Sequence, residues 1–422
     1  MGAICVLNLV ALVALSCENS GYRGCSRMLA KRLEGDCMGV ERVLEELEAA
    51  CGRRYLNSLN PSGSYVIKDG RPLLNLASND YLGISLNNSL KEEFLASHAL
   101  SLPLSSASSR SLSGNFRIYE EFEDYLSSLF SGKRALLFNS GYHLNISCIQ
   151  ALSSLDSVLF LADRFVHASV IDGLRLGKAK FKRYAHNDLD DLGRILESTH
   201  QKFDSVIVIT EGLFSMEGSL AKLEGLCALK KKYKNLLIYL DEAHSVGVFG
   251  DDGLGLARKL GLDCEVDFLV FTFGKAIGSI GASMLCAPAY REFFINKARG
   301  LIYSTALPPF NVAWSFFIFK KLASFVADRD RLASLASLLK KECLRLDRPL
   351  VGEAQILSFL TFSNEAALSL ASRLEDEGFF SPAIRSPTVP KDAARIRISL
   401  TALLDEDSLM RLAAALFRFY KP

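Results

Sequence analysis

The chain has 422 residues, of which 49% are hydrophobic and 23% are charged, and its formal net charge is +2 at pH 7. This is an ordinary soluble composition with enough apolar residues for a large core, and the near-neutral charge offers no field for nucleic acid. The six His and ten Cys match no zinc-ligand spacing, so we expect no metal and interpret the cysteines as reduced thiols of a cytoplasmic protein.

Residues 1–37 form a doubtful N-terminal extension. The apolar run Ile4–Cys17 is too short to span a bilayer, and no Lys or Arg precedes it, although a secretory signal needs a positively charged start. The run is either a lipoprotein-like signal or a sign that translation starts later, at Met28 or Met38. We favour the later start, leave residues 1–37 out of the fold, and expect no membrane attachment.

Strand and helix patterns alternate from about residue 115 to residue 290. Six nearly continuous apolar runs are typical of strands buried on both faces of a parallel sheet. They are Ala135–Asn139, Val158–Ala162, Val206–Thr210, Leu236–Leu240, Leu269–Phe273 and Ala282–Ala287. Helices are expected between them, such as Tyr119–Phe130, His143–Ala151 and Leu220–Tyr233. This alternation predicts an α/β fold with a mostly parallel sheet.

The pattern changes after a long helical stretch, Pro308–Leu346. Two strands and two helices are expected beyond it, at Gln355–Phe362, Glu365–Glu377, Arg395–Thr401 and Leu404–Phe419. They predict a smaller C-terminal α+β domain. The expected organisation is an N-terminal arm on the large domain at 38–75, the large domain at 76–310, a connecting helix at 311–345 and the small domain at 346–422.

Ligands of open α/β sheets bind outside the carboxyl ends of the strands, so the polar residues that follow each strand are the candidate site. In chain order these are Asn139–Tyr142, Asp163 with His167–Ser169, Glu211 with Ser215–Gly218, Asp241–His244 and Thr272–Lys275. The expected crevice therefore combines small hydroxyl groups, carboxylates, imidazoles and one ammonium group.

Each of these groups has a chemical use. Ser140–Tyr142 precedes a helix, whose first backbone N–H groups bind phosphate. A buried carboxylate at Asp241 is costly without a cationic partner, and a pyridinium nitrogen fits that need. Apolar neighbours would lower the pKa of Lys275 and suit it to a Schiff base. Ser215 and Thr272 can bind a phosphate or a ring hydroxyl.

Taken singly, these residues have ordinary explanations: a helix cap for Asp241, a surface position for Lys275 and a structural role for His167. Their joint spacing is more specific. An Asp-ended strand, followed after about 30 residues by a strand ending in Ser/Thr-x-x-Lys, is the pyridoxal-phosphate arrangement.

The motifs resemble the α-oxoamine synthase family of fold-type I pyridoxal-phosphate enzymes over roughly residues 50–420. The resemblance is carried by SNDYLG at 78–83, SGY at 140–142, HAS at 167–169, TEGLFSMEG at 210–218, DEAHSVGVFG at 241–250, TFGKAIG at 272–278 and IYSTALPP at 302–309. It implies a large domain with a mostly parallel seven-stranded sheet, and a homodimer with shared active sites.

The resemblance also implies roles. Lys275 would bind the cofactor covalently and move the substrate's Cα proton, Asp241 would keep the ring nitrogen protonated, His167 would stack on the ring, and His244 would hydrogen-bond the ring hydroxyl or the substrate. The remaining cofactor contacts would be Gly141, Tyr142, Ser215 and Thr272. The expected substrate contacts are Arg53, Asn79, Thr388 and Arg397. Ser304 and Thr305 would reach the phosphate of a neighbouring subunit.

The segments TFGKAIGSIGA (272–282) and AIRSPTVPKDAARIRISLTA (383–402) are similar to the family branch that serves biotin synthesis. The implied reaction is a decarboxylating condensation of L-alanine with a pimeloyl thioester. The alternatives are a serine palmitoyltransferase, an aminoketobutyrate ligase, or a non-catalytic scaffold subunit. Three departures bear on acyl specificity: the glycine-rich GSGGSR stretch reads SSASSR at 105–110, Tyr119 replaces a His, and Ser245 replaces a Gly.

Overall fold

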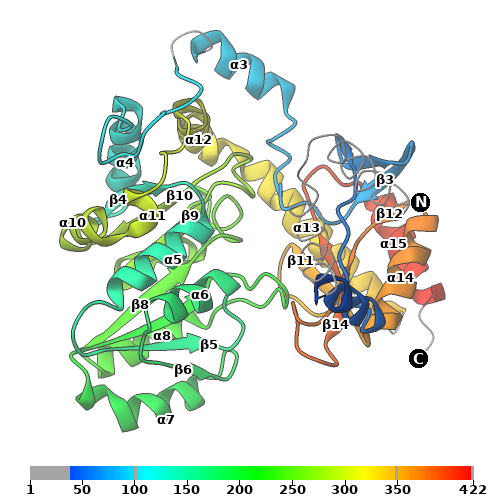
Figure 1. Ribbon diagram of the computed structural model, residues 1–422. Helices are drawn as coiled ribbons and strands as arrows, with labels where there is room; N and C mark the ends of the chain where they lie inside the picture. Colours follow the sequence, from blue (N-terminus) through cyan, green and yellow to red (C-terminus); the bar gives the residue numbers. More distant parts are fainter. Residues whose placement is uncertain (1–38, 99–101, 347–349, 420–422) are drawn as a thin grey trace, which may run out of the picture.

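The computed structural model describes residues 39–98, 102–346 and 350–419, so the expected extension at 1–37 lies outside the described residues. Figure 1 shows a large α/β part and a smaller part, with two long helices running between them. The residue bounds predicted for the domains stay predictions.

A seven-stranded sheet forms the centre of the large part. In spatial order its strands are β4 (Arg134–Phe138), β10 (Ala282–Cys286), β9 (Phe268–Thr272), β8 (Leu236–Asp241), β7 (Ser205–Glu211), β5 (Val158–Asp163) and β6 (Phe181–Tyr184). Only β10 runs antiparallel to its neighbours. The predicted α/β fold with a mostly parallel seven-stranded sheet is confirmed. The six runs expected from the sequence are strands, and the seventh, β6, is an edge strand with three exposed residues and no apolar run.

Helices cover both faces of this sheet, because alternate side chains of each strand point to opposite sides. Leu137 of β4 joins one core, whereas Leu136 and Phe138 join the other. On the first face lie α4 (Arg117–Leu129), α7 (Leu189–Thr199) and α8 (Leu223–Lys232). On the second lie α5 (Gly141–Leu152), α6 (Ala168–Leu176), α10 (Pro288–Lys297) and α11 (Arg299–Ile302). Shorter elements are α3 (Asn88–His98), α9 (Leu256–Lys259), η1 (His200–Lys202) and η2 (Asp263–Glu265).

The long helical stretch is two helices, α12 (Pro309–Lys321) and α13 (Val326–Arg345), joined by the 3₁₀ turn η3 (Leu322–Phe325). Among the described residues it is the one stretch long and apolar enough to cross a membrane by length and composition, with 44% of its most apolar window buried inside the protein. Core helices of globular proteins meet the same criterion. Val312, Phe317 and Leu332 of this stretch belong to the main core.

The C-terminal part has a three-stranded sheet of β11 (Ile356–Phe362), β14 (Ala394–Ser399) and β13 (Ala383–Ile384), with α14 (Asn364–Asp376) and α15 (Glu406–Phe419). This agrees with the expected smaller α+β unit.

The N-terminal arm differs from the prediction that placed it on the large domain. After a helix at 39–49, β1 (Asn60–Ser62), β2 (Tyr65–Lys68) and β3 (Arg71–Asn75) form a second sheet with β12 (Phe379–Phe380) of the C-terminal part. Figure 1 shows β3 beside β12, away from the seven-stranded sheet. The unpaired edge of a strand forms hydrogen bonds with another strand, and the hydrophobic periodicity of the sequence does not identify that strand.

Candidate active site

The carboxyl ends of β4, β9, β8, β7 and β5 meet at one edge of the large sheet, since these strands share a direction. A cavity of about 240 Å³ lies there. Its walls include most of the residues expected around the cofactor: Gly141, Tyr142, His167, Asp241, His244, Thr272 and Lys275. Ser215 is not among its lining residues. Lys275 and Asp241, from neighbouring strands, thus face one cavity.

Asp241 ends β8 and is held by neutral donors. Its Oδ2 accepts a hydrogen bond from Asn145 Nδ2 at 2.8 Å, and its Oδ1 accepts one from the backbone N–H of Ala243 at 3.0 Å. The hydroxyl of Tyr239 donates to Asn145 Oδ1 at 2.7 Å, which fixes the orientation of the amide. The carboxylate is therefore oriented and retains acceptor capacity for a cationic ligand group.

Lys275 follows β9 and lines the same cavity. Burial lowers the pKa of its ammonium group, the charges of Asp241 and Glu211 oppose that change, and Arg397 adds to it. Among the residues that the structure describes, its side chain forms no hydrogen bond and no ion pair. An amine of this kind is suited to covalent chemistry with a carbonyl compound.

Another part of the cavity wall is the N-terminus of α5. Ser140 caps α5 by accepting a hydrogen bond from the backbone N–H of His143 at 3.3 Å, and Gly141 is the first residue of the helix. A Cβ atom at Gly141 would lie 2.5 Å from Thr272 Cγ2, so only glycine leaves this cradle open. A phosphate beside a helix N-terminus, a carboxylate and an amine are the three attachment points that pyridoxal phosphate needs.

His167 precedes α6 as its N-cap residue, lines the cavity and is exposed. Its Nδ1 lies 2.8 Å from Ser169 Oγ, and its backbone N–H donates to Glu211 Oε1 at 2.5 Å. Desolvation lowers the pKa of His167, with the charge of Asp241 opposing and that of Lys275 adding to the effect. The ring of Tyr142 stands edge-on to it at 6.5 Å between centroids.

The sequence pattern predicts Glu211 at a strand end but indicates no role for it in binding or catalysis. It is buried in the same cavity, and burial together with the Asp241 charge raises its pKa well above the usual range, with Lys275 opposing. Asn145 was missed altogether. The available signal was its position one turn into a helix that follows a strand end.

His244 connects the cavity to two distant segments. Its Nδ1 lies 2.6 Å from the hydroxyl of Tyr81, which is also 3.1 Å from Asn79 Oδ1. Arg397 of β14 donates from Nη2 to Asn79 Oδ1 at 3.2 Å and from Nε to the carbonyl of Ser215 at 2.6 Å. The structure therefore brings Asn79, Ser215 and Arg397 together beside the cavity.

The other two expected substrate residues lie elsewhere. Arg53 and Thr388 line a second cavity of about 640 Å³, which does not include Lys275. Thr388 Oγ1 accepts a hydrogen bond from Arg54 Nη2 at 2.6 Å, whereas Arg53 pairs with Glu48 at 3.5 Å. The contact with Thr388 is thus made by Arg54 rather than Arg53.

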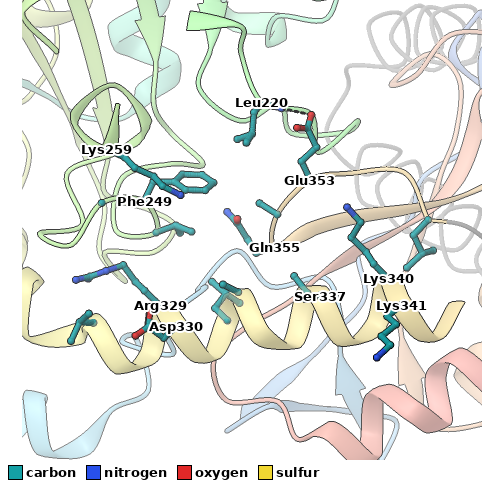
Figure 2. A pocket seen from close by; sticks show the side chains of 18 of the residues that line it. Leu220, Phe249, Lys259, Arg329, Asp330, Ser337, Lys340, Lys341, Glu353 and Gln355 are labelled. Atoms are coloured by element: carbon teal, nitrogen blue, oxygen red, sulfur yellow. Dashed lines mark hydrogen bonds between the residues drawn. The ribbon is translucent and has the colours of Figure 1, made fainter. Parts of the chain in front are cut away.

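A third cavity, of about 740 Å³, is a cleft between α13 and the loop segments at 248–251 and 353–355. Figure 2 shows it from close by, with Gln355 near its centre and Lys340 and Lys341 on α13. It includes neither Asp241 nor Lys275. Gln355 connects it to the smaller cavity, because its Nε2 donates to the carbonyl of His244 at 2.8 Å.

Across the described parts of the chain, no three His, Cys, Asp or Glu side chains gather as metal ligands.

The departures from the family motifs have structural counterparts. Ala107, where a glycine was expected, has φ of +53°, a left-handed conformation that is costly for alanine. The hydroxyl of Tyr119, which replaces a His, donates to the carbonyl of Leu307. Asn139 Nδ2 donates to Ser304 Oγ at 3.0 Å and to the carbonyl of Thr305 at 2.8 Å, which holds both residues near β4.

A model of the family described as aminotransferase class I and II matches residues 71–416. A Neisseria meningitidis protein provisionally named 8-amino-7-oxononanoate synthase is 44% identical over 377 residues, covering 89% of this chain and 99% of the relative. A Glaesserella parasuis protein with the same provisional name is 45% identical over 374 residues, covering 88% and 98%.

Two solved structures are also similar. A serine palmitoyltransferase from S. paucimobilis, solved with a PLP-myriocin aldimine, has a TM-score of 0.81 and 25% identity, covering 90% of this chain and 96% of that one. An 8-amino-7-oxononanoate synthase from Francisella tularensis has a TM-score of 0.68 and 27% identity, covering 82% and 97%.

Proposed function

Because the chain belongs to the aminotransferase class I and II family, we propose that it condenses L-alanine with a pimeloyl thioester to give 8-amino-7-oxononanoate and CO₂. The resemblance to the α-oxoamine synthases is confirmed, and the cofactor is pyridoxal phosphate. The observation that carries the proposal is the shared cavity of Lys275 and Asp241 in a chain about 44% identical to proteins given that provisional name.

Pyridoxal phosphate, when bound, supplies an electron sink for negative charge that develops on the amino acid's Cα. The N-terminus of α5 and Gly141 would hold its phosphate, and Lys275 its aldehyde carbon. Asp241 would accept a hydrogen bond from the ring nitrogen. Because Asn145 already orients this carboxylate, little reorganisation would be needed when the coenzyme binds.

Lys275 would move the proton at the substrate's Cα. A base must be deprotonated to accept a proton, and burial lowers the pKa of this ammonium group, which increases the fraction of free amine at neutral pH. His167, an exposed residue that lines the cavity, would cover one face of the ring and limit the access of water.

Arg397 and Asn79 would bind the carboxylate of the amino acid. Arg397 is almost fully buried, and its hydrogen bonds to Asn79 and to the carbonyl of Ser215 fix its guanidinium group. Arg53, Arg54 and Thr388 would lie near the acyl substrate, in the second cavity.

We also propose that the protein is a cytoplasmic homodimer with shared active sites. Large apolar side chains are exposed in this part of the protein: Tyr142 and Ile280, which line the coenzyme cavity, are 46% and 48% exposed, and Tyr303, which precedes Ser304, is 71% exposed. A second copy would cover such side chains, and apolar patches of this kind mark interfaces.

A serine palmitoyltransferase activity is the second candidate, supported by the TM-score of 0.81 to such an enzyme. An aminoketobutyrate ligase activity, which belongs to the same family, is a third candidate.

The test incubates the holoenzyme with L-alanine, L-serine or glycine against pimeloyl, palmitoyl and acetyl thioesters, and identifies the products by mass spectrometry. The expected result is 8-amino-7-oxononanoate from alanine and the pimeloyl thioester, and none from Lys275→Ala. A product formed with serine or glycine but not with alanine would assign the chain to another activity of the α-oxoamine synthase family. No product in any combination would favour a scaffold subunit.

A further inference from the structure

Tyr81 is a fully buried residue that no step of the proposed reaction uses, and its hydroxyl lies beside His244, which lines the coenzyme cavity. Its relative exposure is 0%, and its hydroxyl oxygen lies 2.6 Å from His244 Nδ1. The two residues are 163 positions apart, so no local turn explains the contact. The other ring nitrogen of His244, Nε2, forms no hydrogen bond with any residue that the structure describes.

The protonation state of His244 follows from its surroundings. The groups that face it are Lys275, Arg397 and His167, and there is no carboxylate among the charges that perturb it. Burial lowers its pKa well below the usual range, and these charges lower it further. The ring is therefore neutral and carries one proton, on either Nδ1 or Nε2.

The hydroxyl of Tyr81 has one proton and two possible acceptors, His244 Nδ1 at 2.6 Å and Asn79 Oδ1 at 3.1 Å. Asn79 Oδ1 already accepts from Arg397 Nη2. The imidazole lone pair is closer and is the stronger base. Burial raises the pKa of Tyr81 to about 12, with Arg397 opposing, so the hydroxyl keeps its proton at working pH.

We propose that Tyr81 is a positioning residue that donates its hydroxyl proton to His244 Nδ1 and so fixes the Nε2–H tautomer of His244 facing the coenzyme cavity. The inference rests on the proposed function, because it makes His244 a hydrogen-bond donor to the coenzyme or the substrate. Nε2–H is a hydrogen-bond donor, and it suits an oxygen that carries negative charge, such as the ring oxygen of pyridoxal phosphate.

Gln355 supports the same residue from the side of the large cleft. Its Nε2 donates to the main-chain carbonyl of His244 at 2.8 Å, while Tyr81 holds the ring. Figure 2 shows Gln355 on the wall of that cleft. The backbone carbonyl and the imidazole of His244 are thus held from two different segments, and Nε2 is the ring nitrogen that has no partner among the described residues.

The first test measures the tautomer directly and needs neither substrate nor activity. The protein is isotope-labelled at its histidine ring nitrogens, with and without pyridoxal phosphate, and NMR correlations between ring protons and nitrogens identify the protonated nitrogen. The signal of His244 is assigned by its loss in His244→Asn. A proton on Nε2 in the unmodified protein is expected, and Tyr81→Phe should give a mixture of tautomers. A proton on Nδ1 in the unmodified protein would overturn the proposal.

The second test asks whether Tyr81 acts through His244. Tyr81→Phe is made alone and with His244→Asn, and the exchange rate of the L-alanine Cα proton in deuterated water is measured on the holoenzymes. We expect a loss of about tenfold with His244 present, as for a lost hydrogen bond, and less than about twofold without it. Equal losses in both backgrounds would indicate a merely structural role and reject the proposal.

Tyr233→Phe is the matched control, because Tyr233 is also buried and its hydroxyl donates to Glu197 Oε2 at 2.6 Å, outside the cavity. It should leave the exchange rate and the coenzyme's visible absorbance unchanged, whereas Tyr81→Phe should shift the pH at which that absorbance titrates. An unchanged titration in Tyr81→Phe would count against the proposal. Failure to make 8-amino-7-oxononanoate, with the expected tautomer present, would reject the proposed function alone.

Discussion

Asn145, in the first turns of α5, donates a 2.8 Å hydrogen bond to the carboxylate of Asp241, which ends a strand almost a hundred residues later. Both side chains are almost fully buried, and the amide also accepts a hydrogen bond from Tyr239. This contact orients the carboxylate that would meet the pyridinium nitrogen. A helix start and a strand end thus combine into one half of the proposed coenzyme site.

Asn145→Leu is expected to destabilise the protein by about 1–3 kcal/mol, because it leaves the Tyr239 hydroxyl and the Asp241 carboxylate short of a buried partner. Affinity for pyridoxal phosphate should fall as well, since the carboxylate is no longer oriented. Chemical denaturation and coenzyme titration measure the two effects. Tyr239→Phe is the control and should lower stability with a smaller loss of coenzyme affinity. Full coenzyme affinity in Asn145→Leu would contradict this account.

Gly141→Ala should weaken the binding of pyridoxal phosphate at least about tenfold, because the added Cβ would lie 2.5 Å from Thr272 Cγ2 in the proposed phosphate site. Thr272→Ser removes that methyl group and keeps the hydroxyl. The double variant Gly141→Ala/Thr272→Ser should therefore recover much of the lost affinity, as measured by fluorescence titration of the apoprotein. No recovery would mean that the methyl contact is not the cause.

The pH dependence of stability should include a contribution from Glu242. Burial raises the pKa of this carboxyl from 4.5 to about 7, although the backbone N–H groups of Leu256 and Ala257 oppose the change. Between pH 4.5 and 7 the folded state holds a proton that the unfolded state has lost, so this contribution falls as pH rises, by ~3 kcal/mol in all.

Glu242→Gln stays neutral at every pH and removes this contribution. Unfolding free energies of the two apoproteins, measured from pH 4.5 to 7, should therefore diverge, with the unmodified protein losing more stability as pH rises. Parallel curves would show that Glu242 does not titrate in this window.

Ala107→Gly should raise the free energy of unfolding by up to about 1 kcal/mol, since the φ of +53° strains alanine and suits glycine. Ala333→Gly, at an exposed position inside α13, is the matched control with the opposite sign and should cost about 0.5–1 kcal/mol. Thermal or chemical unfolding compares the two. Destabilisation by Ala107→Gly would mean that this backbone conformation is not strained in the folded protein.

Much of the site could be predicted because its chemistry lies at the ends of strands with strong local signals. β8 and β9 are buried and largely apolar; Asp241 is the last residue of β8, and Lys275 lies three residues after β9. Parallel strands bring their carboxyl ends to one edge whatever their order, so the shared cavity follows from local pattern. The edge strand β6 gave no such signal, because exposed strands lack a continuous apolar run.

The amino-acid sequence by itself determined the α/β class, the strand ends and the pairing of an Asp with a Lys, because burial and turn chemistry act on neighbouring residues. Only the tertiary structure decided which distant side chains complete the site. Tyr81 meets His244, and Arg397 meets Asn79, across separations of 163 and 318 residues. Such contacts depend on how sheets and helices pack, and a periodic pattern specifies which face is buried but not what it is buried against.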